Sequence, residues 1–161
     1  MPVSRTETDE DYRFMTMALE EARRASELGE VPVGAVLVVN GEVIASRGNE
    51  RERRRDPTAH AEMLVLRDGA AILGGWRLKE ATLYVTIEPC PMCAGAIVLA
   101  RIKRLVYGAD DPKGGAAGTI FNIVDHPALN HHPEVRAGVM TRETAALLRE
   151  FFQERRGREF L

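Results

Sequence analysis

The sequence has few cysteines, no excess of positive charge and no long hydrophobic run, and each shortage excludes a class of protein. Its 161 residues include only two cysteines, Cys90 and Cys93, which cannot form the disulfide framework of a small secreted domain. Lysine and arginine number 22 against 24 acidic residues, a net charge of −2, so a basic protein that coats nucleic acid is excluded. No run approaches the roughly 20 apolar residues of a membrane span, and the start from Met1 to Glu10 has no apolar signal-peptide core. We therefore expect a cytoplasmic protein with no membrane partner.

Hydrophobic patterning predicts a single domain over residues 1–161, with no repeat or linker. Helices are predicted at 9–28, 58–73, 91–101 and 141–156, and strands at 33–39, 42–47, 82–87, 105–107 and 135–140. Thr58 is the expected N-cap of the second helix, and residues 50–57 are expected to form a charged loop. Alternating strands and helices, with Asn40-Gly41 as a hairpin turn, predict an α/β sandwich around one sheet with an antiparallel edge.

Two short segments concentrate side chains that bind metal ions: His60-Ala61-Glu62 and Pro89-Cys90-Pro91-Met92-Cys93. Each segment stands where a helix is expected to begin, and the two sulfurs of Cys-x-x-Cys can reach one ion across a first helical turn. A helix N-terminus also favours the thiolate, which is the form that binds metal. His60, Cys90 and Cys93 make three ligands, whereas structural zinc has four, so one position stays open for water as in catalytic sites.

Glu62 decides between the possible uses of this cluster. A carboxylate that lies beside zinc-bound water without binding the ion can shuttle protons, because zinc lowers the pKa of that water to about 7. Taken alone, Cys-x-x-Cys after a strand also fits a thioredoxin-type redox site, and Glu62 also fits a solvated acid at a helix start. The pairing of His-x-Glu with Pro-Cys-x-x-Cys is the signature of zinc-dependent nucleobase deaminases.

The motifs resemble those of the cytidine-deaminase-like superfamily, and longer stretches are similar to the bacterial tRNA adenosine deaminases. The similarity runs from about Asp11 to Arg156. It includes the stretches 31–36, 56–62, 88–96, 114–118 and 126–131. The zinc motifs indicate the superfamily only, whereas the later segments point to tRNA. The resemblance implies a three-layer α/β/α sandwich around a mixed five-stranded sheet.

The resemblance also implies a reaction, the hydrolytic deamination of adenosine to inosine at the wobble position of a tRNA anticodon. One Zn²⁺ per subunit would be held by His60, Cys90 and Cys93, with Glu62 as the proton shuttle and no organic cofactor. Asn49 would hydrogen-bond the nucleoside, and the backbone N–H of Ala61 would meet the attacking oxygen. Contacts with the anticodon loop are expected from Asp111, Lys113, His126, Asn130, Phe151, Phe152 and Arg155. Members of this family form homodimers, so we expect a dimer.

Three other functions stay open at this point. A deaminase of free bases or nucleotides, of the guanine or cytosine type, would keep the zinc motifs without the RNA-facing segments. A redox or structural protein would use Cys90 and Cys93 without hydrolysis, and a non-catalytic RNA-binding module would have no use for Glu62. The basic run from Arg51 to Arg55 has two interpretations as well, a solvated loop or a patch that contacts phosphates.

Overall fold

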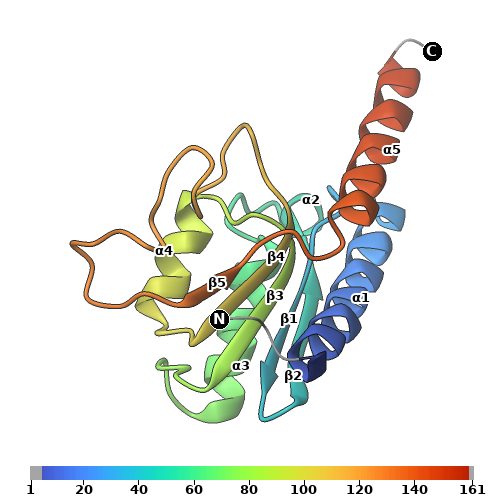
Figure 1. Cartoon of the computed structure of the whole chain (residues 1–161). Coiled ribbons are helices and arrows are strands. Elements are labelled where there is room, and N and C mark those ends of the chain that lie inside the picture. Colours follow the sequence, from blue (N-terminus) through green and yellow to red (C-terminus); the bar gives the residue numbers. More distant parts are fainter. Residues whose placement is uncertain (1–4, 160–161) are drawn as a thin grey trace.

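The computed structural model describes residues 5–159 and has one mixed five-stranded sheet between two layers of helices (Figure 1). The elements are α1 (Arg5–Glu27), β1 (Gly34–Val39), β2 (Glu42–Gly48), α2 (Arg51–Arg54), α3 (Ala61–Leu73), β3 (Ala81–Ile87), α4 (Pro91–Leu99), β4 (Arg104–Ala109), β5 (Glu134–Arg136) and α5 (Thr141–Glu159). The strand order is β2-β1-β3-β4-β5. β1 is antiparallel to β2 and β3, whereas β3, β4 and β5 run parallel. The predicted three-layer α/β/α sandwich is confirmed.

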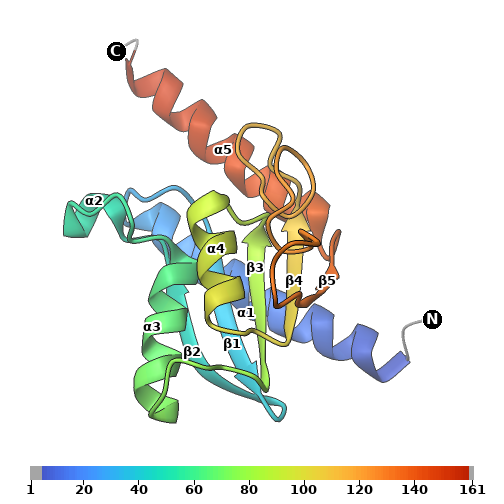
Figure 2. The same ribbon diagram turned by 90° about the vertical axis from the view of Figure 1, so that its left-hand side faces the viewer.

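Each face of the sheet is covered by its own helices. α3 and α4 lie on one face, and α1 and α5 lie on the other (Figure 2). Successive residues of β1 point to opposite faces of the sheet and so contribute to both hydrophobic cores. Leu37 packs under α3 and α4, and Val36 packs against Phe14 of α1. A strand buried on both faces must be apolar throughout, which explains the continuous hydrophobic run in this part of the sequence.

The hairpin of β1 and β2 lies unusually close to α1. A Cβ built on Gly34 would stand 1.9 Å from the carbonyl oxygen of Ala18, and one built on Gly48 would stand 2.8 Å from that of Glu21. No side chain fits at either position. The two glycines therefore determine how closely α1 approaches the sheet.

A buried carboxylate ties α1 to three strands. Asp11 accepts a bidentate pair from Arg104 of β4 at 2.7 and 2.8 Å, a bond from Arg136 of β5 at 2.6 Å, and one from the Tyr84 hydroxyl of β3 at 2.7 Å. Asp11 is fully buried, so these bonds replace the water that it loses on folding. The network connects the edge of the parallel part of the sheet to the helix behind it.

Three predicted boundaries were wrong. The charged loop at 50–57 contains the one-turn helix α2. Thr58 is not the N-cap of α3, because its N–H and hydroxyl both donate to Asp56; the cap is His60. The last strand is β5 at 134–136 rather than 135–140, because Gly138 turns the chain at φ 83°. None of the helices in residues 5–159 is long and apolar enough to cross a membrane.

Candidate active site

The predicted metal ligands come together between the starts of α3 and α4. His60 Nδ1 lies 3.7 Å from the sulfur of Cys90 and 3.6 Å from that of Cys93. A tetrahedral zinc ion with its usual bond lengths requires a nitrogen–sulfur separation of about 3.6 Å. All three ligand atoms lie within 4.8 Å of one another, and they are the only such group found among the described residues. The geometry fits a single metal ion with three protein ligands.

Local backbone geometry leaves these side chains free to bind a metal. His60 and Cys90 are the N-cap residues of α3 and α4, both with extended backbone, and neither side chain caps its own helix. Pro91 at the first position of α4 needs no hydrogen-bond partner there, which favours a helix start at this point. Cys93 lies one turn further on and is buried. Two helix starts thus bring three ligands to one point.

The pKa values of the two thiols are shifted in opposite directions. A hydrogen bond from Cys93 lowers the pKa of the Cys90 thiol to about 4, and the same bond, with burial, raises the pKa of Cys93. The hydrogen bond with Cys90 also raises the pKa of His60. Because a metal ion takes thiolate and neutral imidazole, its binding would release protons from this cluster.

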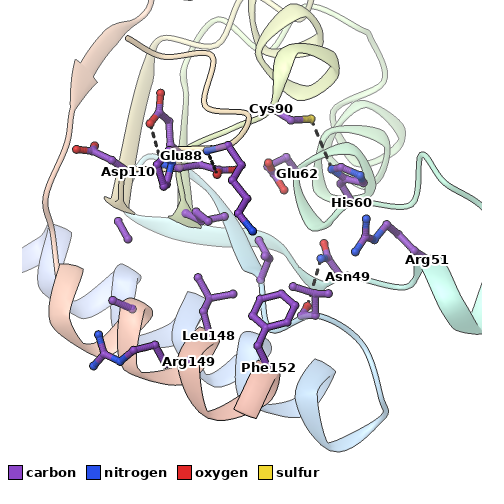
Figure 3. A pocket seen from close by; sticks show the side chains of 18 residues that line it. Asn49, Arg51, His60, Glu62, Glu88, Cys90, Asp110, Leu148, Arg149 and Phe152 are labelled. Atoms are coloured by element: carbon purple, nitrogen blue, oxygen red, sulfur yellow. Dashed lines mark hydrogen bonds between the residues drawn. The ribbon is translucent and has the colours of Figure 1, made fainter. Parts of the chain in front are cut away.

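Glu62 lies beside the metal-ligand cluster but is not part of it (Figure 3). Its side chain is buried and lines the cavity next to His60. Burial raises the pKa of the Glu62 carboxyl, so it can exchange protons nearer to neutral pH than an exposed glutamate. A buried carboxyl beside three possible metal ligands could exchange protons with a metal-bound water.

The cavity in front of these residues has a volume of about 510 Å³, which is within the range of small-molecule sites. Its walls come from both helix layers: the starts of α3 and α4, the segment after β4, and one face of α5 (Figure 3). Of the predicted site residues, seven lie together here, namely Asn49, His60, Glu62, Cys90, Asp111, Lys113 and Phe152.

Asn49 connects the end of β2 to the start of α3. Its side-chain amide donates to the Val31 carbonyl at 3.2 Å, and its carbonyl oxygen accepts from the Ala61 N–H at 2.9 Å. The Ala61 N–H, which was predicted to meet the attacking oxygen, therefore donates to Asn49 in this structure. Its role toward the attacking oxygen stays a prediction. Asn49 itself is oriented by two bonds at the cavity wall.

Four other predicted contacts lie outside the cavity lining. His126 and Asn130 are exposed in the segment between β4 and β5. Phe151 is buried and stacks edge-on against Phe152, and the Arg155 guanidinium lies 5.0 Å from the Phe151 ring. Their contacts with RNA stay predictions.

The arginines of the basic run at 51–55 have different surroundings in the structure. Arg53 and Arg54 pair with Glu50 at 3.4 and 2.7 Å, and Arg53 also lies 3.4 Å from buried Glu30. Arg51 has no carboxylate within ion-pair distance among the described residues, and it lines the cavity. Part of the run is neutralised, and one arginine faces the site.

The sequence reasoning missed Glu88, a second buried carboxylate at the cavity. It accepts hydrogen bonds from the backbone N–H groups of Asp111, Ala117 and Thr119 at 3.0, 2.9 and 3.1 Å, and one from the Thr119 hydroxyl. Burial acts to raise the pKa of Glu88, but these bonds outweigh it and lower the pKa. An acidic residue directly after an apolar strand, and before Pro-Cys, was the available signal.

Comparison with known proteins extends over nearly the whole chain. Residues 9–156 match the family model described as MafB19-like deaminase. A tRNA-specific adenosine deaminase of Bacillus subtilis is 52% identical over 147 residues, which cover 91% of each chain. The tRNA-specific adenosine deaminase of Haemophilus influenzae is 48% identical, covering 97% of this chain and 91% of its own.

Two solved structures resemble the fold to different degrees. One, from a study of A-to-I editing by tRNA:A34 deaminases at the wobble position of transfer RNA, has a TM-score of 0.82 and 51% identity, covering 84% of this chain and 99% of its own. The other is a guanine deaminase of Bacillus subtilis with a TM-score of 0.60 and 33% identity, covering 90% and 92%. The likeness is greater to the protein that acts on tRNA.

Proposed function

Because the chain belongs to the family of tRNA-specific adenosine deaminases, we propose that it hydrolyses adenosine to inosine at the wobble position of a tRNA anticodon. The observation that carries the proposal is buried Glu62 beside the group of His60, Cys90 and Cys93 at the base of the cavity. The greater likeness to the tRNA:A34 deaminase than to the guanine deaminase supports adenosine in RNA as the substrate. The whole chain, residues 1–161, acts as one domain.

We propose that the metal is one Zn²⁺ per subunit, with no organic cofactor. Two sulfurs and one imidazole are the donor set that zinc prefers, and the measured separations fit its bond lengths. When bound, the ion supplies a water molecule whose pKa is lowered to about 7.

Glu62 moves the protons in this reaction. Its carboxylate takes a proton from the attacking water as the oxygen bonds to carbon 6 of adenine, and gives that proton to ring nitrogen 1. It then carries the second proton to the amino group, the C–N bond breaks, and ammonia leaves. Burial favours the protonated state of Glu62 that this cycle passes through.

The RNA contacts follow the predicted set. Asn49 hydrogen-bonds the nucleoside, and the Ala61 backbone N–H meets the attacking oxygen. Asp111, Lys113 and Phe152 hold the neighbouring nucleotides at the cavity wall. The anticodon loop is single-stranded, so placing one base in the cavity avoids most of the cost of extracting it from a duplex. His126, Asn130, Phe151 and Arg155 contribute at the edges of this surface.

Two copies of the chain form the working enzyme, which operates in the cytoplasm with tRNA. Leu99 of α4 is 69% exposed, and Ile120 and Phe121 in the segment after β4 are each 52% exposed. Burial of these apolar side chains between two copies would remove them from water, which supports the proposed dimer.

The experiment measures inosine formed from an anticodon stem–loop with adenosine at the wobble position, compared with free adenosine, guanine and cytosine. Product only from the stem–loop supports the proposal, whereas activity only on a free base overturns it. Glu62→Gln should keep one zinc per chain and reduce inosine formation at least about 100-fold, because a positioned acid–base group contributes about that much or more. A zinc-free protein with a reversible Cys90–Cys93 disulfide would support the redox alternative instead.

A further inference from the structure

The segment from Asp111 to Thr119 has no regular secondary structure, and its first three residues, 111–113, line the cavity. It includes Asp111 and Lys113, and apart from an isolated bridge at Ala117 it has no strand partner. Its backbone N–H groups must find other acceptors, because an unpaired polar group that is cut off from water is costly. Three of them find the same acceptor.

That acceptor is Glu88, which follows the last residue of β3 and is 1% exposed. One carboxylate oxygen accepts from the Asp111 N–H and the Thr119 hydroxyl, and the other from the N–H groups of Ala117 and Thr119. Each oxygen accepts two hydrogen bonds, so all four acceptor positions of the carboxylate are occupied. Glu88 borders the cavity but has no oxygen left for a substrate.

Gly115 supplies an independent observation. A Cβ built on this residue would stand 2.4 Å from the carboxyl carbon of Glu88 and 2.4 Å from one of its oxygens. The backbone of the segment therefore lies directly against the carboxylate, and any side chain at position 115 would separate them. The glycine and the glutamate fit each other as a pair.

We propose that Glu88 is a positioning residue that holds the 111–119 segment in place, so that Asp111 and Lys113 meet the RNA at fixed positions. The proposal rests on the proposed function for its substrate, but its structural part does not. Glu88 stands two residues before Cys90, so the same strand end positions the metal ligand and the RNA-facing wall. Loss of Glu88 should therefore weaken RNA binding much more than the chemical step.

The first test replaces Glu88 with glutamine, which puts an NH₂ group against backbone donors and removes the charge. We expect KM for the stem–loop to rise at least tenfold, kcat to change less than threefold, and zinc content to stay the same. Amide hydrogen exchange of Ala117 and Thr119 should accelerate at least tenfold. Glu80→Gln, an exposed site just before β3, is the matched control and should change none of these quantities. If Glu88→Gln does not fold, Thr119→Val removes one donor and should raise KM and exchange less steeply.

The second test uses the fit between Glu88 and Gly115. Gly115→Ala should raise KM at least tenfold, because its methyl group displaces the carboxylate. Glu88→Asp shortens the side chain by one C–C bond, about 1.5 Å, and makes room for that methyl group. The double variant should therefore have a KM no higher than that of the worse single variant, a strongly non-additive result.

Several outcomes would overturn the proposal. These are a loss of kcat at unchanged KM in Glu88→Gln, unchanged amide exchange, or KM increases that multiply in the double variant. An inactive wild-type protein would refute the proposed function instead, and the amide exchange would still decide the role of Glu88.

Discussion

Of the two interpretations of the basic run, we predict for Arg51 a contact with an RNA phosphate, which can be tested one charge at a time. Arg51 lines the cavity, and Figure 3 shows it on the side of Asn49 and His60, across from Arg149 on α5. Arg54 lies on the same short helix, but its guanidinium is 2.7 Å from Glu50. Replacing each arginine with glutamine therefore removes the same charge from two neighbouring positions, of which only one faces the substrate.

The expected effect can be worked out from the number of phosphates lost. A charge-assisted hydrogen bond is worth about 1.5 kcal/mol, so Arg51→Gln should weaken binding of the stem–loop roughly tenfold at 50 mM salt. Each phosphate contact with a single strand contributes about −0.7 to the slope of log K against log salt. When salt rises from 50 to 200 mM, the affinity of the wild type should fall by a factor about 2.6 times larger than the factor by which the affinity of the variant falls. Arg54→Gln should change neither quantity.

Fluorescence anisotropy of a labelled stem–loop measures both quantities, with Glu62→Gln as the shared background so that the substrate is not converted. A wild-type salt slope in Arg51→Gln would show that this arginine touches no phosphate. Equal losses in Arg51→Gln and Arg54→Gln would show that only the general charge of α2 matters. Either result would refute the assignment.

Two further predictions concern stability. Asp11→Asn should lower the free energy of unfolding in urea by about 3 kcal/mol, because Arg104 and Arg136 are left facing a neutral amide. Burial acts to raise the pKa of Asp11, but its hydrogen bonds outweigh burial and lower the pKa. The stabilisation from Asp11 is therefore present above about pH 4 and is lost as the pH falls. The free energy of unfolding of the wild type should depend more steeply on acid pH than that of the variant. Gly34→Ala should unfold the protein or lower Tm by more than 10 °C, because its methyl group meets a backbone carbonyl of α1. Gly95→Ala in α4 meets nothing within 4 Å and should not lower Tm, because alanine favours the helix. Equal melting temperatures for the two glycine variants would contradict the packing of α1.

Local patterns in the sequence were enough to predict most of the fold and the group of possible metal ligands. His60, Cys90 and Cys93 could be found because ligand chemistry and helix starts both leave short-range signals. Thr58 was mistaken for a helix cap because an N-cap threonine and a threonine bonded to Asp56 look the same in sequence.

The interactions that sequence could not predict join residues far apart in the chain. Glu88 depends on donors more than 20 residues away. Arg54 pairs with Glu50, whereas Arg51 lines the cavity. No periodicity reports such pairings, because they arise only when the sheet brings strand ends and loops together.

The face that α5 turns toward the cavity consists of Ala145, Leu148, Arg149 and Phe152. These positions are spaced three, one and three residues apart, which is one stripe along a helix. None of them holds the metal or Glu62, so their side chains can be exchanged singly while the reacting centre and the backbone stay as they are. Substitutions on this face of α5 should therefore change the range of accepted nucleotides while the reacting centre stays the same.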